Sequence, residues 1–173
     1  MGIDVRKAVG ALTMAVRIEQ NGYRFYRRAA DETNDPKAKA LFEGLAEDEV
    51  EHECILKRRL EALEQEGVWT PVAEDEWPAA GPRAGEEPVF APERLDREVR
   101  DYTSELSALR MAYLIEKNAV EFYRKAARET EDPVGKTMYE ELAEWEREHQ
   151  RILETEYGFL ADRFKLDMGF APF

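Results

Sequence analysis

Glutamate and histidine occur in this sequence at a spacing that could hold a metal ion. Glu49 and His52 lie in a predicted helix, on the face that also carries the apolar residues Phe42, Leu45 and Leu56, because residues three and four apart share one side of a helix. A core-facing surface therefore carries one carboxylate and one imidazole. Burying a carboxylate is unfavourable unless it is paired or bound to a metal. The pair thus predicts a metal site inside the fold.

The same pair returns 97 residues later as Glu146 and His149, so the two Glu-x-x-His pairs use both histidines of the chain. Residues 18–56 align with residues 115–153 without a gap, and 22 of the 39 aligned positions are identical. Such identity indicates two copies of one helical hairpin, which would pair about a pseudo-twofold axis.

Two further glutamates, Glu19 and Glu116, fall on the inward faces of their own predicted helices and occupy equivalent positions of the repeat. One Glu from each of two helices, with one Glu-x-x-His from each of the other two, is typical of di-iron and di-manganese bundles. Carboxylates can bridge two cations, and imidazole suits first-row transition metals. In the simplest assignment two glutamates bridge and the others are terminal. The candidate metal ligands are Glu19, Glu49, His52, Glu116, Glu146 and His149.

Other readings of these residues stay open. A polar core held by hydrogen bonds alone would need no metal. Tyr26 and Tyr123 lie two turns beyond Glu19 and Glu116 on the same faces. They are candidate catalytic residues that could hydrogen-bond a ligand carboxylate or donate to bound oxygen, and equally they could be core tyrosines. The neighbouring glutamates are expected to be solvated; they are Glu47, Glu51, Glu144 and Glu148.

Four helices are expected to position these groups. Asp35-Pro36 and Asp132-Pro133 each combine a capping residue with a proline suited to the first helical position. The short connections at these points favour antiparallel hairpins. The helices are predicted over about 4–31, 36–66, 104–130 and 133–157.

The remaining segments are expected to connect and cover the helices. Residues 68–102 contain five of the eight prolines and predict a long crossover between the hairpins. Its Trp69 and Trp77 favour an ordered segment over a disordered linker, and a short helical turn is expected within 93–100. The phenylalanine-rich tail, residues 158–173, is predicted to pack on the bundle or on a partner chain. The prediction is a single all-α domain over 1–173, a ferritin-like four-helix bundle.

Composition excludes several classes of protein. The formal charge of −13 argues against nucleic-acid binding, which needs a basic surface. No apolar run of about 20 residues could span a membrane, and the first residues lack the apolar core of a signal peptide; we therefore expect a cytoplasmic protein. Cys54 is the single cysteine, so an intramolecular disulfide and a four-cysteine rubredoxin site are excluded for these residues.

Over residues 12–63 and 109–157, the paired Glu…Glu-x-x-His motif resembles the rubrerythrin family of the ferritin-like superfamily. The resemblance implies a four-helix bundle with a long crossover, often dimeric, that holds two iron ions. It also implies reduction of hydrogen peroxide with electrons delivered through a rubredoxin-type iron centre. Carried over position by position, the metal ligands are the six residues already named.

The sequence departs from this family in two ways. Peroxide-reducing members carry an extra carboxylate three residues after the third-helix ligand, where this chain has Ala119, with Gly22 at the equivalent first-helix position. The four-cysteine domain is absent, so a separate electron donor such as a rubredoxin is expected. The predicted function is a di-iron oxidoreductase that acts on peroxide or oxygen, and the predicted assembly is a homodimer. Manganese or a mixed metal pair is the alternative to two iron ions. The alternatives are a ferroxidase or iron-handling protein, simple metal binding, and an oxidase of an organic substrate.

Overall fold

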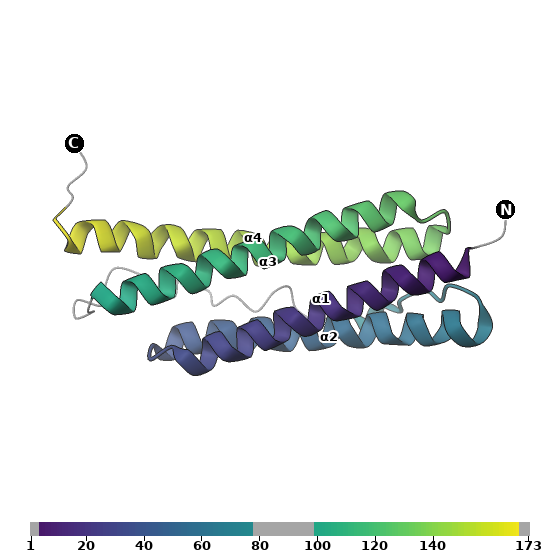
Figure 1. The fold of residues 1–173 in the computed structure, drawn as a ribbon, viewed down its shortest axis with the longest axis horizontal. Helices are drawn as coiled ribbons and strands as arrows, with labels where there is room; N and C mark the ends of the chain where they lie inside the picture. Colours follow the sequence, from purple (N-terminus) through teal and green to yellow (C-terminus); the bar gives the residue numbers. More distant parts are fainter. Residues whose placement is uncertain (1–3, 78–98, 170–173) are drawn as a thin grey trace.

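A computed structural model describes residues 4–77 and 99–169 of the chain. The described residues form long α-helices and one short 3-10 helix, with no strand among them. This confirms the predicted all-α bundle (Figure 1). The elements are α1 (Val5–Glu32), α2 (Pro36–Glu66), η1 (Glu74–Glu76), α3 (Val99–Glu129) and α4 (Pro133–Asp167). None of the described helices is both long and apolar enough to cross a membrane.

The two hairpins are set up by the same local chemistry. The carboxylate of Asp35 accepts a hydrogen bond from the backbone N–H of Lys37 at 2.8 Å and caps α2. Asp132 caps α4 in the same way, accepting from the N–H of Val134 at 2.9 Å. Such caps satisfy N–H groups that have no partner within the helix. The chain therefore reverses sharply twice, and α1 runs antiparallel to α2 as α3 does to α4 (Figure 1).

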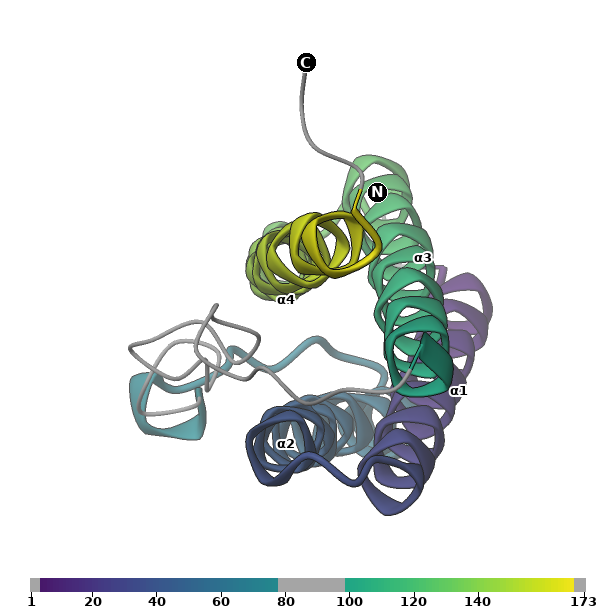
Figure 2. The ribbon, with the colours of Figure 1, turned by 90° about the vertical axis from the view of Figure 1, so that its left-hand side faces the viewer.

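The hairpins meet chiefly through α1 and α3, which lie side by side, while α2 and α4 face each other on the opposite side of the bundle (Figure 2). The core consists of two apolar clusters, and each cluster takes residues from all four helices. In every helix the two clusters are separated by a short segment that carries a buried glutamate. One cluster includes Leu12, Ile55, Tyr123 and Leu142, and the other includes Tyr26, Phe42, Leu109 and Leu153. A polar layer thus crosses the middle of the bundle.

The helix ends differ from the prediction in the second hairpin. α3 begins at Val99 instead of about 104, and α4 continues through Gly158 to Asp167 instead of ending near 157. Leu160 is 1% exposed, and the ring of Phe164 lies 5.6 Å from that of Tyr102 on α3. A glycine inside a helix costs only about 1 kcal/mol, and this packing offsets it. Residues 170–173 of the predicted tail lie outside the described residues.

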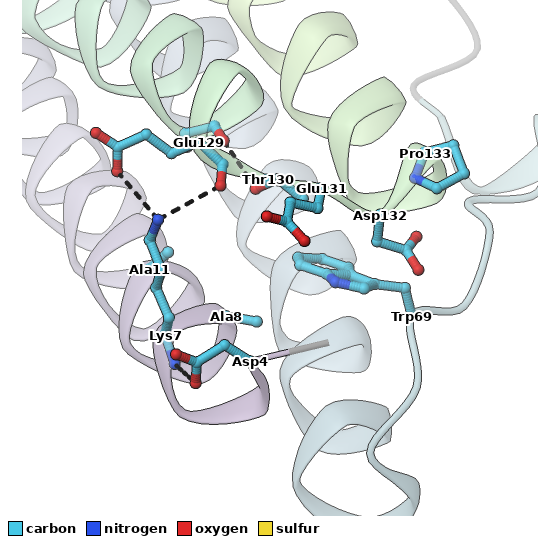
Figure 3. Close-up of a pocket in the computed structure, with 11 residues that line it drawn as sticks. Asp4, Lys7, Ala8, Ala11, Trp69, Glu129, Thr130, Glu131, Asp132 and Pro133 are labelled. Carbon is cyan, nitrogen blue, oxygen red and sulfur yellow. Dashed lines mark hydrogen bonds and ion pairs between the residues drawn. The ribbon is translucent and has the colours of Figure 1, made fainter. Parts of the chain in front are cut away.

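The first part of the predicted crossover packs on the bundle. Trp69 is 7% exposed and lies beneath the start of α4, where it borders a pocket of about 690 Å³ (Figure 3). At the rim of this pocket Lys7 of α1 donates to the backbone carbonyl of Glu129 of α3 at 3.4 Å. Buried Arg59 of α2 donates to the carbonyl of Pro71 at 2.6 Å. Residues 78–98, including most of the expected turn at 93–100, lie outside the described residues.

The contact between Trp69 and α4 predicts opposite effects of two glycine substitutions in one helix. A Cβ at Gly135 would lie 2.6 Å from the Trp69 ring, which is large and rigid, so Gly135→Ala should lower the free energy of unfolding by about 1–3 kcal/mol. A Cβ at Gly158 meets nothing within 4 Å, so Gly158→Ala should raise it by about 0.5–1 kcal/mol. Denaturant unfolding of both variants tests this, and effects of the same sign would contradict the placement of Trp69.

Candidate metal centre

The structure brings all six sequence-predicted ligands into the polar layer. α1 supplies Glu19, α2 supplies Glu49 and His52, α3 supplies Glu116, and α4 supplies Glu146 and His149. Each of these side chains is at most 3% exposed. Their burial follows from the apolar residues that precede and follow them on the same helix faces, since those residues form the two clusters of the core.

The six side chains form two overlapping groups of four. In each group one ligand atom from every residue lies within 4.8 Å of the others, which is close enough to surround one ion. Both groups contain Glu49 and Glu146. The first group is completed by Glu19 and His52, and the second by Glu116 and His149. The arrangement is therefore two adjacent candidate positions for metal ions with two carboxylates in common.

Both imidazoles turn the same ring nitrogen toward the carboxylates. Nδ1 of His52 lies 3.2 Å from Oε2 of Glu19 and 3.0 Å from Oε1 of Glu146. Nδ1 of His149 lies 3.2 Å from Oε2 of Glu146 and 3.8 Å from Oε1 of Glu116. The two rings are 5.7 Å apart. One nitrogen of each histidine is thus available to the candidate metal positions.

The two tyrosines connect the hairpins at the site. The hydroxyl of Tyr26 on α1 donates to Glu116 of α3, and the hydroxyl of Tyr123 on α3 donates to Glu19 of α1. Both tyrosines are fully buried. Three roles were considered for these tyrosines, and the contact that the structure shows is the first of them, a hydrogen bond to a candidate ligand carboxylate. Each tyrosine therefore holds the carboxylate that belongs to one metal position only.

The charges in this layer shift one another's proton affinities. Burial, together with Glu146, raises the pKa of both Glu49 and Glu116 above the usual range. Burial also opposes ionisation of Glu146, but the adjacent imidazoles outweigh it and hold the pKa of Glu146 well below its usual range. Burial disfavours the charged form of His52, yet Glu146 and Glu19 raise its pKa to about 10. Without a metal, protons balance part of the negative charge.

The residues present fit a pair of divalent cations. Four glutamates carry up to four negative charges, which two divalent ions would neutralise, and oxygen with imidazole nitrogen is a donor set that suits iron and manganese. Oε2 of Glu116 is buried and has no hydrogen-bond partner among the described residues. Such an atom is unfavourable in a folded protein, and a bound cation would satisfy it.

Two residues of the site were missed from the sequence. Asp48 is fully buried, and its Oδ2 lies 3.2 Å from Nε2 of His149. Gly22 is buried against Glu49, and a Cβ there would lie 2.7 Å from Oε1 of that glutamate. Asp48 shares a helix face with Leu45 and His52, a signal that could have found it. Of the glutamates expected to be solvated, Glu47, Glu144 and Glu148 are exposed, whereas Glu51 is half-buried.

Gly22 predicts a substitution that disturbs the site and leaves the fold intact. In Gly22→Ala the new Cβ must displace the Glu49 carboxylate, which sits at the end of a flexible side chain and can move. We expect the affinity for divalent metal to fall by about 10–100-fold, as for other changes that misplace a ligand. Gly10→Ala in the same helix is the control, because its Cβ meets nothing within 4 Å. Equal metal affinities of the two variants, measured by chelator competition, would contradict this role.

The raised pKa of His52 predicts different pH dependences of stability with and without metal. Between the ordinary histidine pKa of about 6.5 and the folded value of about 10, the folded metal-free state binds more protons than the unfolded state. Its free energy of unfolding should therefore fall as pH rises through this range, by up to about 1.4 kcal/mol per pH unit for one proton.

Metal replaces these protons, so in this pH range neither the metal-loaded folded state nor the unfolded chain carries a proton on His52. The free energy of unfolding of the metal-loaded protein should therefore change little with pH over the same range. Denaturant unfolding at several pH values, with and without a divalent metal, measures both dependences. Parallel curves for the two forms would show that the buried cluster does not exchange protons for metal.

Comparison with known proteins agrees with this geometry. A family model described as Rubrerythrin matches residues 10–157, a range that contains all six candidate ligands and both tyrosines. No curated protein and no solved structure gives a significant match. Rubrerythrins typically bind iron, and the buried carboxylate and imidazole groups are able to hold a metal. The match, the helical hairpins and the buried cluster lead to one conclusion: the chain is a ferritin-like four-helix bundle and belongs to the rubrerythrin family.

Proposed function

We propose that this protein is a di-iron oxidoreductase that reduces hydrogen peroxide, or activates oxygen, with electrons from a separate donor. The observation that carries the proposal is the pair of buried ligand groups that share Glu49 and Glu146. Each group would hold one metal ion, and Glu49 and Glu146 would contribute to both positions. Glu19 with His52 would complete one position, and Glu116 with His149 would complete the other.

Two iron ions held in this way would supply two electrons, which is the number that reduction of one peroxide molecule to two water molecules requires. The chain's own residues orient the carboxylates and keep bulk water out. Tyr26 and Tyr123 hold the two terminal glutamates through hydroxyl protons donated to their carboxylates. The apolar clusters on both sides of the layer lower the local dielectric, so each of these interactions is stronger than it would be in water.

The proposal includes partners outside the chain. The single cysteine, Cys54, is exposed and cannot form a four-thiolate iron centre with the residues given, so a separate protein of the rubredoxin type is the proposed electron donor. A homodimer is the proposed assembly. The exposed apolar side chains of Met111 and Leu114 on α3, at 57% and 46%, support a protein contact on that helix.

A ferroxidase is the second candidate, and the likeness of the two ligand groups favours it. Each group contains three glutamates and one histidine, and the position of the extra family carboxylate is taken by Ala119, which is buried. In this case Fe(II) is the substrate and leaves the site after oxidation. Consumption of many Fe(II) ions per chain would distinguish it from a peroxidase.

The test is metal analysis and rapid kinetics on protein purified without oxygen. We expect about two iron ions per chain in the wild type and none in a Glu49→Ala/Glu146→Ala variant with unchanged helical content. Mixed separately with peroxide and with oxygen, the reduced protein should react faster with peroxide. Faster reaction with oxygen and repeated turnover of added Fe(II) would support the ferroxidase instead. Absence of stoichiometric iron or manganese would overturn both.

A further inference from the structure

The internal repeat breaks down next to one residue of each Glu-x-x-His pair. Position 48 aligns with position 145, yet the first copy has Asp48 and the second has Trp145. Both residues come directly before a candidate bridging glutamate. Because the hairpins pair about a pseudo-twofold axis, each side chain would face the histidine of the other hairpin. The ligand groups are alike, and their surroundings are not.

On one side, Asp48 contacts His149. Its Oδ2 lies 3.2 Å from Nε2 of His149, and both side chains are fully buried. A proton on Nε2 can be donated to the carboxylate, which leaves the lone pair of Nδ1 directed at the candidate metal position. A carboxylate in this place fixes the ring orientation and makes the imidazole a stronger donor to a metal.

On the other side, Trp145 contacts His52 without offering an acceptor. The two rings meet edge to face at 5.7 Å and an angle of 75°. Nε2 of His52 is buried and has no hydrogen-bond partner within the part of the chain that the structure describes. The indole N–H is a donor only, so it cannot take the place of the carboxylate. His52 therefore lacks the support that His149 receives.

We infer that the two metal positions are inequivalent and fill in order, first the position of Glu116 and His149 and then that of Glu19 and His52. Asp48 is the positioning residue that makes the difference. This inference rests on the proposed two-metal site. Outer carboxylates of this kind typically change metal affinity by about 10–100-fold, which sets the expected gap between the two binding steps. One ion is held firmly, and the other is the exchangeable one.

The test is calorimetric titration of the metal-free full-length protein with Mn²⁺, which needs no turnover. The wild type should bind two ions in steps that differ by about 10-fold or more in affinity. Glu116 belongs to one ligand group only, and Glu19 to the other only. Glu116→Gln should therefore abolish the tight step, and Glu19→Gln the weak one. Loss of the weak step in Glu116→Gln would overturn the order of filling.

Asp48→Asn tests the positioning role, because it keeps the shape and removes the charge. We expect it to weaken the tight step by about 10-fold or more and to leave the weak step unchanged. Glu47→Gln removes one charge from the exposed neighbouring position and is the matched control, with circular dichroism as the check on folding. Trp145→Asp should strengthen the weak step and narrow the gap between the two.

The outcomes separate this inference from the proposed function. Two ions bound with equal affinity, or an Asp48→Asn variant that titrates like Glu47→Gln, would overturn the inequivalence while the two-metal site stands. A wild type that binds no Mn²⁺ and no Fe²⁺ would instead remove the proposed function on which the inference depends.

Discussion

The structure depends on keeping four carboxylates and two imidazoles inside an apolar bundle. An ionised carboxylate in such surroundings is very unfavourable unless opposite charge lies next to it. The histidines supply part of that charge at 3.0–3.2 Å, and the two tyrosines supply hydrogen bonds from the opposite hairpin. What is left must come from protons or from cations. The buried negative charge of this fold is therefore balanced only when the interior binds protons or cations.

The fold and the polar layer could be predicted because both follow from local patterns. Glu49 and His52 interrupt an apolar helical face, and the same pattern recurs at Glu146 and His149. The hairpins follow from Asp-Pro pairs that act within one turn of the helix. The end of α4 depends instead on contacts with distant residues. Leu160 and Phe164 extend that helix because they pack with α3. The local sequence around Gly158 gives no sign that the helix continues past this glycine.

Asp48 lies on the helix face of Leu45 and His52, but it did not stand out as Glu49 and His52 did. Its charge looks like that of exposed Glu47 beside it, and its partner His149 is 101 residues away on the other hairpin. The repeat does not indicate a role for Asp48 either, because the aligned residue in the second copy is Trp145. Gly22 was noticed only as a position without a carboxylate. In the structure the Glu49 carboxylate occupies the space that a side chain at position 22 would need.

Three departures from the repeat lie where the two halves of the bundle make different contacts. Gly135, where the first copy has Ala38, admits the ring of Trp69 and joins the crossover to α4. Gly22 and Asp48, where the second copy has Ala119 and Trp145, both act on the centre itself. A duplicated hairpin provides matching ligands, and these substitutions then make the two halves of the site different.

The most direct test of the central claim is a crystal structure of the iron-loaded protein with anomalous diffraction measured at the iron absorption edge. The account predicts two anomalous peaks in the polar layer. One should lie among Glu19, Glu49, His52 and Glu146, and the other among Glu49, Glu116, Glu146 and His149. Iron found only at surface carboxylates, with the six buried side chains hydrogen-bonded to one another as in the metal-free protein, would contradict it.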